Sequence, residues 1–141
     1  MTPITIPGTR RRRPTAGRRR LSPETRMLRA VTEADFLAQV IDLARLLGYR
    51  VAHFRPAFTA RGWRTPVQGD GAGFPDLVLV GRGRVIVAEL KRELGSVTPD
   101  QSSWLAAFAA AGVEAHVWRP RDLEAIAACL STVPAAPELP A

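Results

Sequence analysis

Residues 73–91, GFPDLVLVGRGRVIVAELK, decide how this chain folds. They contain two apolar, β-rich runs, Leu77–Val80 and Val85–Leu90, joined by the sequence Gly81-Arg82-Gly83-Arg84. Short runs of this kind on either side of a glycine-containing turn are typical of a β-hairpin. The stretch therefore predicts two antiparallel strands joined by a tight turn.

The turn also predicts which side chains of the two strands face each other. A turn centred between Arg82 and Gly83 places Asp76 directly opposite Glu89. Directly opposed side chains in an antiparallel pair have Cβ atoms about 4.5–5.5 Å apart, so these two carboxylates should repel each other. A divalent cation would remove the repulsion, and carboxylate oxygens suit Mg²⁺ or Mn²⁺. The pair predicts a metal site, although each acid taken alone could be a strand-end residue at the surface.

Three further polar residues are expected to converge on the same place. Lys91, the only lysine in the chain, lies two residues beyond Glu89 and so projects from the same face of the strand. Glu33 and Gln101 each share a helical face with apolar residues four and seven positions later. A carboxylate or amide on such a face needs a partner. On their own, Glu33 could be an acid favoured by the helix dipole and Gln101 a surface amide.

The rest of the chain predicts helices around this hairpin. Proline- and glycine-rich residues 55–73 are expected to form a long loop. The order α-β-β-β-α-β-α belongs to an α/β domain with a mixed sheet flanked by helices. The expected helices are residues 32–47, 98–111 and 121–130, and the strands outside the hairpin are residues 49–54 and 114–118.

The net charge of +7 is concentrated in one segment. Residues 1–29 carry nine basic residues and one acid, whereas residues 30–141 carry 11 basic and 12 acidic residues. We expect residues 1–29 to be a disordered arginine-rich arm, residues 30–131 the folded domain and residues 132–141 a flexible proline-rich tail. The arm could attract phosphate through counterion release or merely keep the chain soluble, so charge alone identifies no function.

Composition excludes several other classes of protein. No apolar run reaches the roughly 18 residues that cross a bilayer, and no signal peptide is recognisable, so we expect no membrane partner. The single cysteine, Cys129, excludes an internal disulfide and a cysteine-based zinc site. These observations favour a cytoplasmic protein.

The residues singled out above match a known nuclease pattern. Residues 73–80, followed by Val87-Ala88-Glu89-Leu90-Lys91, resemble the PD-(D/E)xK nuclease superfamily. More narrowly, the chain resembles the virus-type replication-repair nuclease family, VRR-NUC, over residues 32–130. The further matches are Glu33, Thr98-Pro99-Asp100-Gln101, Trp104, Gly112 and Trp118-Arg119-Pro120.

The resemblance implies a restriction-endonuclease-like fold and metal-dependent hydrolysis of DNA phosphodiesters. In such a site, Asp76, Glu89 and the backbone carbonyl of Leu90 would hold Mg²⁺ or Mn²⁺. Glu33 would assist directly or through a water molecule.

The resemblance also implies roles for the remaining site residues and a class of substrate. Lys91 would orient or deprotonate the attacking water, and Gln101 would position Lys91 or that water. Stand-alone members of the family resemble dimeric resolvases of branched DNA, so we expect a homodimer that acts on four-way (Holliday) junctions. The alternatives are a nuclease for simple duplexes, flaps or ends, and a non-catalytic DNA-binding module of the same fold.

Basic and aromatic residues beside the expected long loop are candidates for contact with DNA. Trp63 could stack on a base while neighbouring arginines grip the phosphate backbone. A purely structural role for the histidine, or a stray exposed aromatic in a loop, is equally consistent with the sequence. The candidates are His53, Arg55, Arg61, Trp63 and Arg64.

Overall fold

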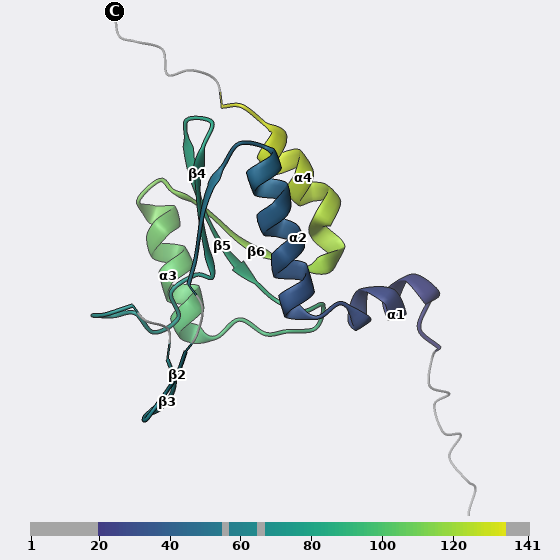
Figure 1. Ribbon diagram of the computed structural model, residues 1–141, viewed down its shortest axis with the longest axis horizontal. Coiled ribbons are helices and arrows are strands. Elements are labelled where there is room, and N and C mark those ends of the chain that lie inside the picture. The colour runs from purple at the N-terminus through teal and green to yellow at the C-terminus, as the bar shows by residue number, and fades with distance from the viewer. Residues whose placement is uncertain (1–19, 55–56, 65–66, 135–141) are drawn as a thin grey trace, which may run out of the picture.

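A computed structural model describes residues 20–54, 57–64 and 67–134 of the chain (Figure 1). Its centre is a four-stranded sheet in the order β1-β4-β5-β6. The first three of these strands pair antiparallel, and β6 runs parallel to β5. The mixed sheet predicted from the sequence is therefore confirmed. The strands are β1 (Arg50–His53), β4 (Leu77–Gly81), β5 (Arg84–Leu90) and β6 (Glu114–Trp118).

The β4–β5 hairpin has the register that its turn predicts. The ladder ends with Leu77 opposite Ala88, so Asp76 and Glu89 occupy the next position beyond the last pair. Both central residues of the turn have positive φ angles, 51° and 72°. This is the geometry of the two-residue turn that matches the natural twist of a hairpin. A purely local feature thus fixes which side chains meet at the open end.

Helices cover both faces of the sheet (Figure 1). On one face, α2 (Glu33–Leu46) packs against α4 (Leu123–Ser131), and on the other α3 (Pro99–Ala110) covers β5 and β6. A 3₁₀ turn, η1 (Pro120–Asp122), leads into α4. The apolar core lies between the sheet and the α2–α4 pair. Its buried members include Phe36, Val40, Ala44, Leu77, Leu79, Ile86, Leu90, Trp118, Ile126 and Leu130.

The expectation of disorder up to residue 29 is wrong over α1 (Pro23–Ala30). Ser22 caps this helix by accepting a hydrogen bond from the amide of Thr25, and proline occupies the first helical position, as helix starts favour. The helix has only eight residues, none of them buried, and it follows the proline- and arginine-rich run on which the expectation of disorder rested. Residues 1–19 and 135–141, which include most of the expected arm and tail, lie outside the described residues. In the described ranges, no helix is long and apolar enough to span a membrane.

The expected long loop over residues 55–73 instead contains a second hairpin. Its strands β2 (Ala57–Thr59) and β3 (Gly62–Arg64) pair antiparallel as a separate two-stranded sheet. The hydroxyl of Thr59 donates to the carbonyl of Gly62 and closes the turn. In Figure 1 this hairpin projects from the edge of the domain where β1 ends and β4 begins. Strands of three residues are too short to give a periodic signal, which explains the error.

Arg84 ties the closed end of the β4–β5 hairpin to its neighbours. Its guanidinium forms a two-pronged ion pair with Glu114 and donates to the carbonyls of Cys129 at 2.8 Å and Thr132 at 2.9 Å. The last carbonyls of a helix have no partner within the helix, so Arg84 supplies what the end of α4 lacks. The hydrogen bonds from Arg84 also hold the pKa of Glu114 below its ordinary value.

We predict that Arg84→Leu lowers the free energy of unfolding by about 2–4 kcal/mol, because it leaves charge-assisted hydrogen bonds unmade at a little-exposed site. Urea denaturation measures the effect. Arg82→Leu is the control, because Arg82 donates to the carbonyls of Leu47 and Ser131 from an exposed position and should cost less than about 1 kcal/mol. Equal losses in the two variants would contradict the role given to Arg84.

Candidate active site

The residues predicted to form a site meet at one edge of the sheet. At this edge β4 begins and β5 ends, and Figure 1 shows that α2 and α3 begin there as well. Four elements therefore bring side chains from their ends to one place. The ends of strands and helices can hold polar side chains, because the apolar core is formed by the middle of each element.

Glu89 lies at the centre of the site. Its side chain is only 2% exposed, and it is the only charged residue classed as buried in the described part of the chain. Its Oε1 accepts hydrogen bonds from Gln101 Nε2 at 2.5 Å and from Lys91 Nζ at 2.7 Å. Its Oε2 is buried and has no hydrogen-bond partner among the described residues. A buried carboxylate oxygen without a partner is costly, so this atom is a candidate ligand for a cation.

Asp76 lies beside Glu89 and is held by the backbone of the neighbouring strand. Its Oδ2 accepts a hydrogen bond from the amide of Leu90 at 2.8 Å. The charge of Asp76 raises the pKa of Glu89, which reflects how close the two carboxylates are. The structure thus brings together the two acids that the hairpin register placed opposite each other.

Burial raises the pKa of both carboxyl groups. For Glu89 the pKa rises to about 7 through burial; the ammonium of Lys91 acts in the opposite direction, and the charges of Asp76 and Glu33 add to the rise. For Asp76 burial again has the largest effect, against a backbone amide and the positive charges of Lys91 and His53. A divalent cation would favour the ionised forms of both groups, so the donor set fits such an ion.

Gln101 reaches Glu89 from a fixed position in the first turn of α3. The hydroxyl of Thr98 accepts from the backbone amide of Gln101, and Gln101 Oε1 accepts from the amide of Thr98 at 2.8 Å, which makes a capping box. Because its oxygen is used by Thr98, the amide nitrogen of Gln101 is the atom that faces Glu89. We expected Gln101 to position Lys91 or a water molecule, and this role stays a prediction. In the structure its amide nitrogen donates to Glu89 Oε1, the oxygen that Lys91 also binds.

Close packing holds α3 against the segment that precedes β4. Gly73 has a φ of 77°, and a Cβ there would lie 2.5 Å from the carbonyl carbon of Asp100, so only glycine fits. Phe74 packs edge-on against Trp104 and Phe108, with ring centroids 5.0 Å and 5.9 Å apart. These contacts set the distance between α3 and the segment that leads into β4. Gly73 and Phe74 belong to the stretch that resembles the PD-(D/E)xK pattern, but their sequence alone predicted no role for either residue.

Lys91 is placed by the strand beside it. Its backbone amide donates to the carbonyl of Trp118 at 2.9 Å, and its side chain is 14% exposed. The loop after it is fastened by Arg119, whose Nη2 donates to the carbonyl of Gly95 at 2.7 Å. The Trp118-Arg119-Pro120 segment therefore supports the site by holding the backbone of Lys91 and the loop that follows it.

Glu33 reaches the site from the first turn of α2. It is exposed and lines a cavity of about 510 Å³ together with Asp76, Leu90 and His53. Its charge is near enough to raise the pKa of Glu89. All five residues expected to be catalytic therefore lie at this edge of the sheet.

The residues proposed to contact DNA are more dispersed. His53, at the end of β1, lines the cavity just described. Arg61 and Trp63 lie on the projecting β2–β3 hairpin, where the side chain of Trp63 is 71% exposed. Arg55 lies outside the described residues, as does the side chain of Arg64.

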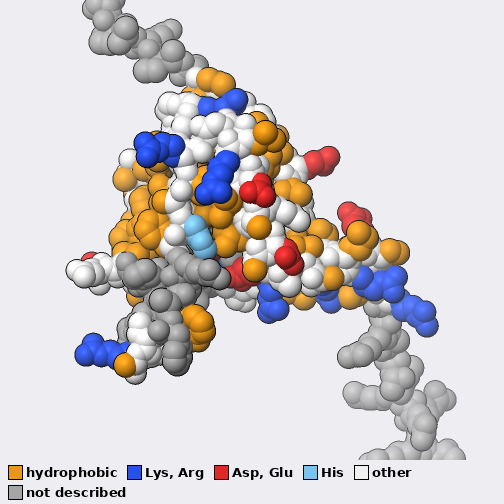
Figure 2. Space-filling model, viewed as in Figure 1, with side chains coloured by type: hydrophobic (Ala, Val, Ile, Leu, Met, Phe, Trp, Pro, Cys, Tyr) orange, Lys and Arg blue, Asp and Glu red, His pale blue; other side chains and the backbone are white. Residues whose placement is uncertain are grey.

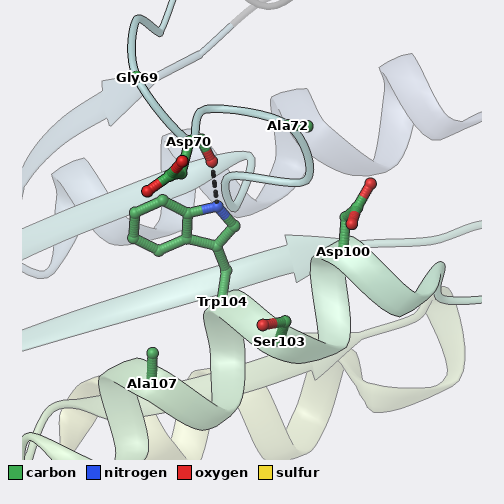
Figure 3. A pocket seen from close by; sticks show the side chains of 7 residues that line it. All are labelled: Gly69, Asp70, Ala72, Asp100, Ser103, Trp104 and Ala107. Carbon is green, nitrogen blue, oxygen red and sulfur yellow. Dashed lines mark hydrogen bonds between the residues drawn. The ribbon is translucent and has the colours of Figure 1, made fainter.

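A larger cavity of about 610 Å³ lies along the outer side of α3 (Figure 3). Its described lining residues include the carboxylates of Asp70 and Asp100 and no basic side chain, so it is poorly suited to phosphate. The indole Nε1 of Trp104 donates to the carbonyl of Asp70 at 2.9 Å and thereby fastens the loop to the helix. We interpret this hollow as a structural feature beside the site.

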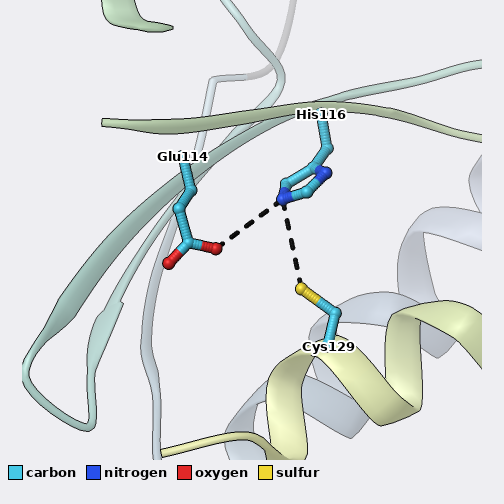
Figure 4. A group of neighbouring side chains, drawn as sticks. All are labelled: Glu114, His116 and Cys129. Atoms are coloured by element: carbon cyan, nitrogen blue, oxygen red, sulfur yellow. Dashed lines mark hydrogen bonds and ion pairs between the residues drawn. The ribbon is translucent and has the colours of Figure 1, made fainter. Parts of the chain in front are cut away.

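A second group of possible metal ligands lies at the far end of β6 (Figure 4). His116 Nε2 is 3.8 Å from Glu114 Oε2 and 4.0 Å from Cys129 Sγ. Arg84 already binds both carboxylate oxygens of Glu114 and lies 3.6 Å from the sulfur. Its guanidinium would repel a second cation over such distances. We therefore interpret this cluster as structural, and the edge that carries Glu89 as the better candidate for a cation site.

The raised pKa of Glu89 predicts how stability depends on pH without a metal. The native state binds this proton more tightly than the unfolded state does, so stability falls as pH rises from about 4.5 through 7. Glu89→Gln should therefore raise the melting temperature in EDTA at pH 8 and change it little at pH 5. Calorimetry at both values tests this, with Glu124→Gln as an exposed control. Equal shifts at both pH values would argue against a buried charge at position 89.

The side chain of Gln101 binds both the amide of Thr98 and the carboxylate of Glu89, which predicts an effect of Gln101 on metal affinity. Gln101→Ala removes the helix cap and the hydrogen bond to Glu89, whereas Thr98→Ala removes only the cap, which costs about 1 kcal/mol of stability. Mn²⁺ affinity measured by calorimetric titration should fall at least about tenfold in Gln101→Ala. It should stay close to wild type in Thr98→Ala. A similar fall in both variants would mean that Gln101 acts only through the helix.

Comparison with known families agrees with this geometry. The sequence model of the VRR-NUC domain matches residues 23–122, most of the chain, and so includes all five expected catalytic residues as well as α1. No curated protein and no solved structure gives a significant match. The chain therefore belongs to the VRR-NUC family, whose nucleases of the PD-(D/E)xK type act on DNA with a divalent metal ion.

Proposed function

We propose that this protein is a Mg²⁺- or Mn²⁺-dependent endonuclease that hydrolyses DNA phosphodiesters, with four-way junctions as its preferred substrate. One observation supports the metal-dependent reaction above all. The Oε2 atom of Glu89 is buried beside Asp76 and has no hydrogen-bond partner among the described residues. A binding module without catalysis would have no need for a buried carboxylate beside a half-buried one at a single point.

The donor set explains which atoms would hold the cation. Glu89 Oε1 and Asp76 Oδ2 are occupied by hydrogen bonds from the chain, which leaves the second oxygen of each acid for a metal. The amide of Leu90 binds Asp76, and the amide and carbonyl of a strand residue point toward the same neighbour. This supports the carbonyl of Leu90 as a third ligand. When bound, the cation would polarise the phosphate and supply a water-derived nucleophile near neutral pH.

The remaining side chains orient groups around the reacting phosphate. Lys91 keeps its ammonium on Glu89 Oε1 and has further N–H donors, so it can donate to a phosphate oxygen on which negative charge develops. Its ion pair with Glu89 favours this role over proton removal. Gln101 keeps the Glu89 carboxylate in one orientation. Glu33, at the rim of the cavity, can bind a water molecule or the cation through water.

The expected homodimer remains part of the proposal, because stand-alone family members resemble dimeric resolvases. A symmetric dimer would present two active sites for paired incisions. An apolar surface near the β4–β5 turn supports it: Val80 is 46% and Val85 42% exposed, and Ala52 and Val78 lie nearby on β1 and β4. Figure 2 shows hydrophobic side chains gathered over this part of the molecule, with basic side chains among them.

The projecting β2–β3 hairpin supports the proposed contact with DNA. It follows β1 directly and so starts from the edge of the sheet that carries the site. Arg61 and the highly exposed Trp63 on this hairpin offer a cation for the backbone and a ring for stacking on an unpaired base. Arg55 and Arg64 belong to the same proposal.

A cleavage assay tests the function. A four-way junction and a matched linear duplex are incubated with the protein in Mg²⁺ or Mn²⁺, and in EDTA. We expect metal-dependent paired nicks on the junction and a rate at least about 100-fold lower for Lys91→Ala. Arg45→Ala, exposed at the opposite end of α2, is the control and should retain activity. Sedimentation of the same samples measures whether the protein is a dimer.

Each of the other outcomes would reject one part of the proposal. Cutting of both substrates, or of flaps and ends, would keep the nuclease and reject the preference for junctions. Binding without cutting by the wild-type protein in either metal would favour the non-catalytic module. Full activity of Lys91→Ala would reject the role given to Lys91.

A further inference from the structure

The cavity of about 510 Å³ between α2 and the end of β1 has two ends of different chemistry. Asp76 and Glu33 form the polar end, next to the proposed cation. The other wall is one apolar face of α2, with residues at helical spacings of three and four. These apolar residues are Ala34, Leu37, Ala38 and Ile41.

The hydrolysis of a phosphate uses the polar end alone. The apolar wall is still open to ligands, because Leu37 and Ile41 are half-buried and Ala34 and Ala38 are exposed. The cavity has the size of a small-molecule pocket, and an apolar lining with a few polar groups at one point is typical of such pockets. The part of the substrate that contacts this wall must therefore be weakly polar and attached to a phosphate.

A nucleobase has these properties. When the phosphate lies at Asp76 and Glu33, the base of the same nucleotide can lie along α2, and the half-buried ring of His53 lines the cavity beside it. A base that is paired and stacked in a duplex cannot enter such a pocket, whereas an unstacked base can. A peptide suits the cavity less well, because the phosphate occupies the polar end during the reaction.

We propose that this cavity receives a nucleobase next to the cut phosphate, unstacked from the DNA. The inference rests on the proposed nuclease function and deepens it. It names the substrate class as DNA with an unpaired or easily unstacked nucleotide at the point of cleavage, such as the branch point of a junction. Recognition of this kind depends on how easily a base leaves its stack, because the described wall offers apolar contact to any base.

The test uses two exposed neighbours on α2. Ala38→Leu fills the cavity, and Gln39→Leu, which is not among the lining residues, adds a similar side chain outside it. Leucine favours helices and both positions are exposed, so both variants should fold. The position of the cut is first mapped in Mg²⁺. Two sets of junctions are then made, with a substitution at each nucleotide beside the cut. One set carries 2-aminopurine, whose fluorescence rises when it is unstacked, and the other carries an abasic nucleotide.

For wild type and Gln39→Leu we expect a rise in 2-aminopurine emission at one position, measured in Ca²⁺ with gels confirming intact DNA. An abasic nucleotide at that position should raise KM roughly fivefold or more, because it removes about one stacking contact between a base and the protein. Ala38→Leu should abolish both the rise and the abasic effect.

Cleavage without either effect at any position would overturn this inference and leave the nuclease intact. Equal behaviour of the two leucine variants would overturn the assignment to the cavity. No cleavage by the wild-type protein would overturn the proposed function, and this inference with it.

Discussion

The buried carboxylate of Glu89 is the constraint on which the arrangement of the site depends. A charge at this depth is tolerated only when its surroundings are fixed, because a misplaced donor would leave it uncompensated. Lys91 and Gln101 bind one of its oxygens, and each is itself anchored, Lys91 through the carbonyl of Trp118 and Gln101 through the helix cap. Two anchored donors therefore fix the position of one oxygen, and the other, Oε2, is the atom that we propose as a ligand for a cation.

The sequence could predict the parts of the site that depend on local rules. The tight turn sets the register of β4 and β5, so Asp76 and Glu89 could be placed together without knowledge of the rest of the chain. The alternation of side chains along a strand then places Lys91 on the same face as Glu89. The mixed sheet followed from the order of elements, because its last strand, Glu114–Trp118, is reached through a helix.

The parts that could not be predicted depend on contacts between distant segments or on signals too weak to read. Gly73 is required because α3 lies against it, and only the folded chain shows that approach. The contact of Gln101 with Glu89 could not be predicted for the same reason, although the capping box that orients the side chain of Gln101 can be read from Thr98-Pro99-Asp100-Gln101. α1 has eight residues and no buried face, so it was not separated from the arginine-rich run before it. β2 and β3 are three residues long, which is too short for a periodic signal.

Strand β5 shows how the fold can tolerate a destabilising charge at its functional edge. Its middle residues Ile86, Val87 and Ala88 are fully buried, and it pairs with a strand on each side. At its first residue Arg84 binds Glu114 and the end of α4, whereas at its other end Glu89 resists ionisation. Stability gained at one end of a rigid strand can therefore offset the cost at the other, since both act on one cooperative unit. The edge at which we propose that a cation binds can then keep its half-buried and buried carboxylates without loss of the fold.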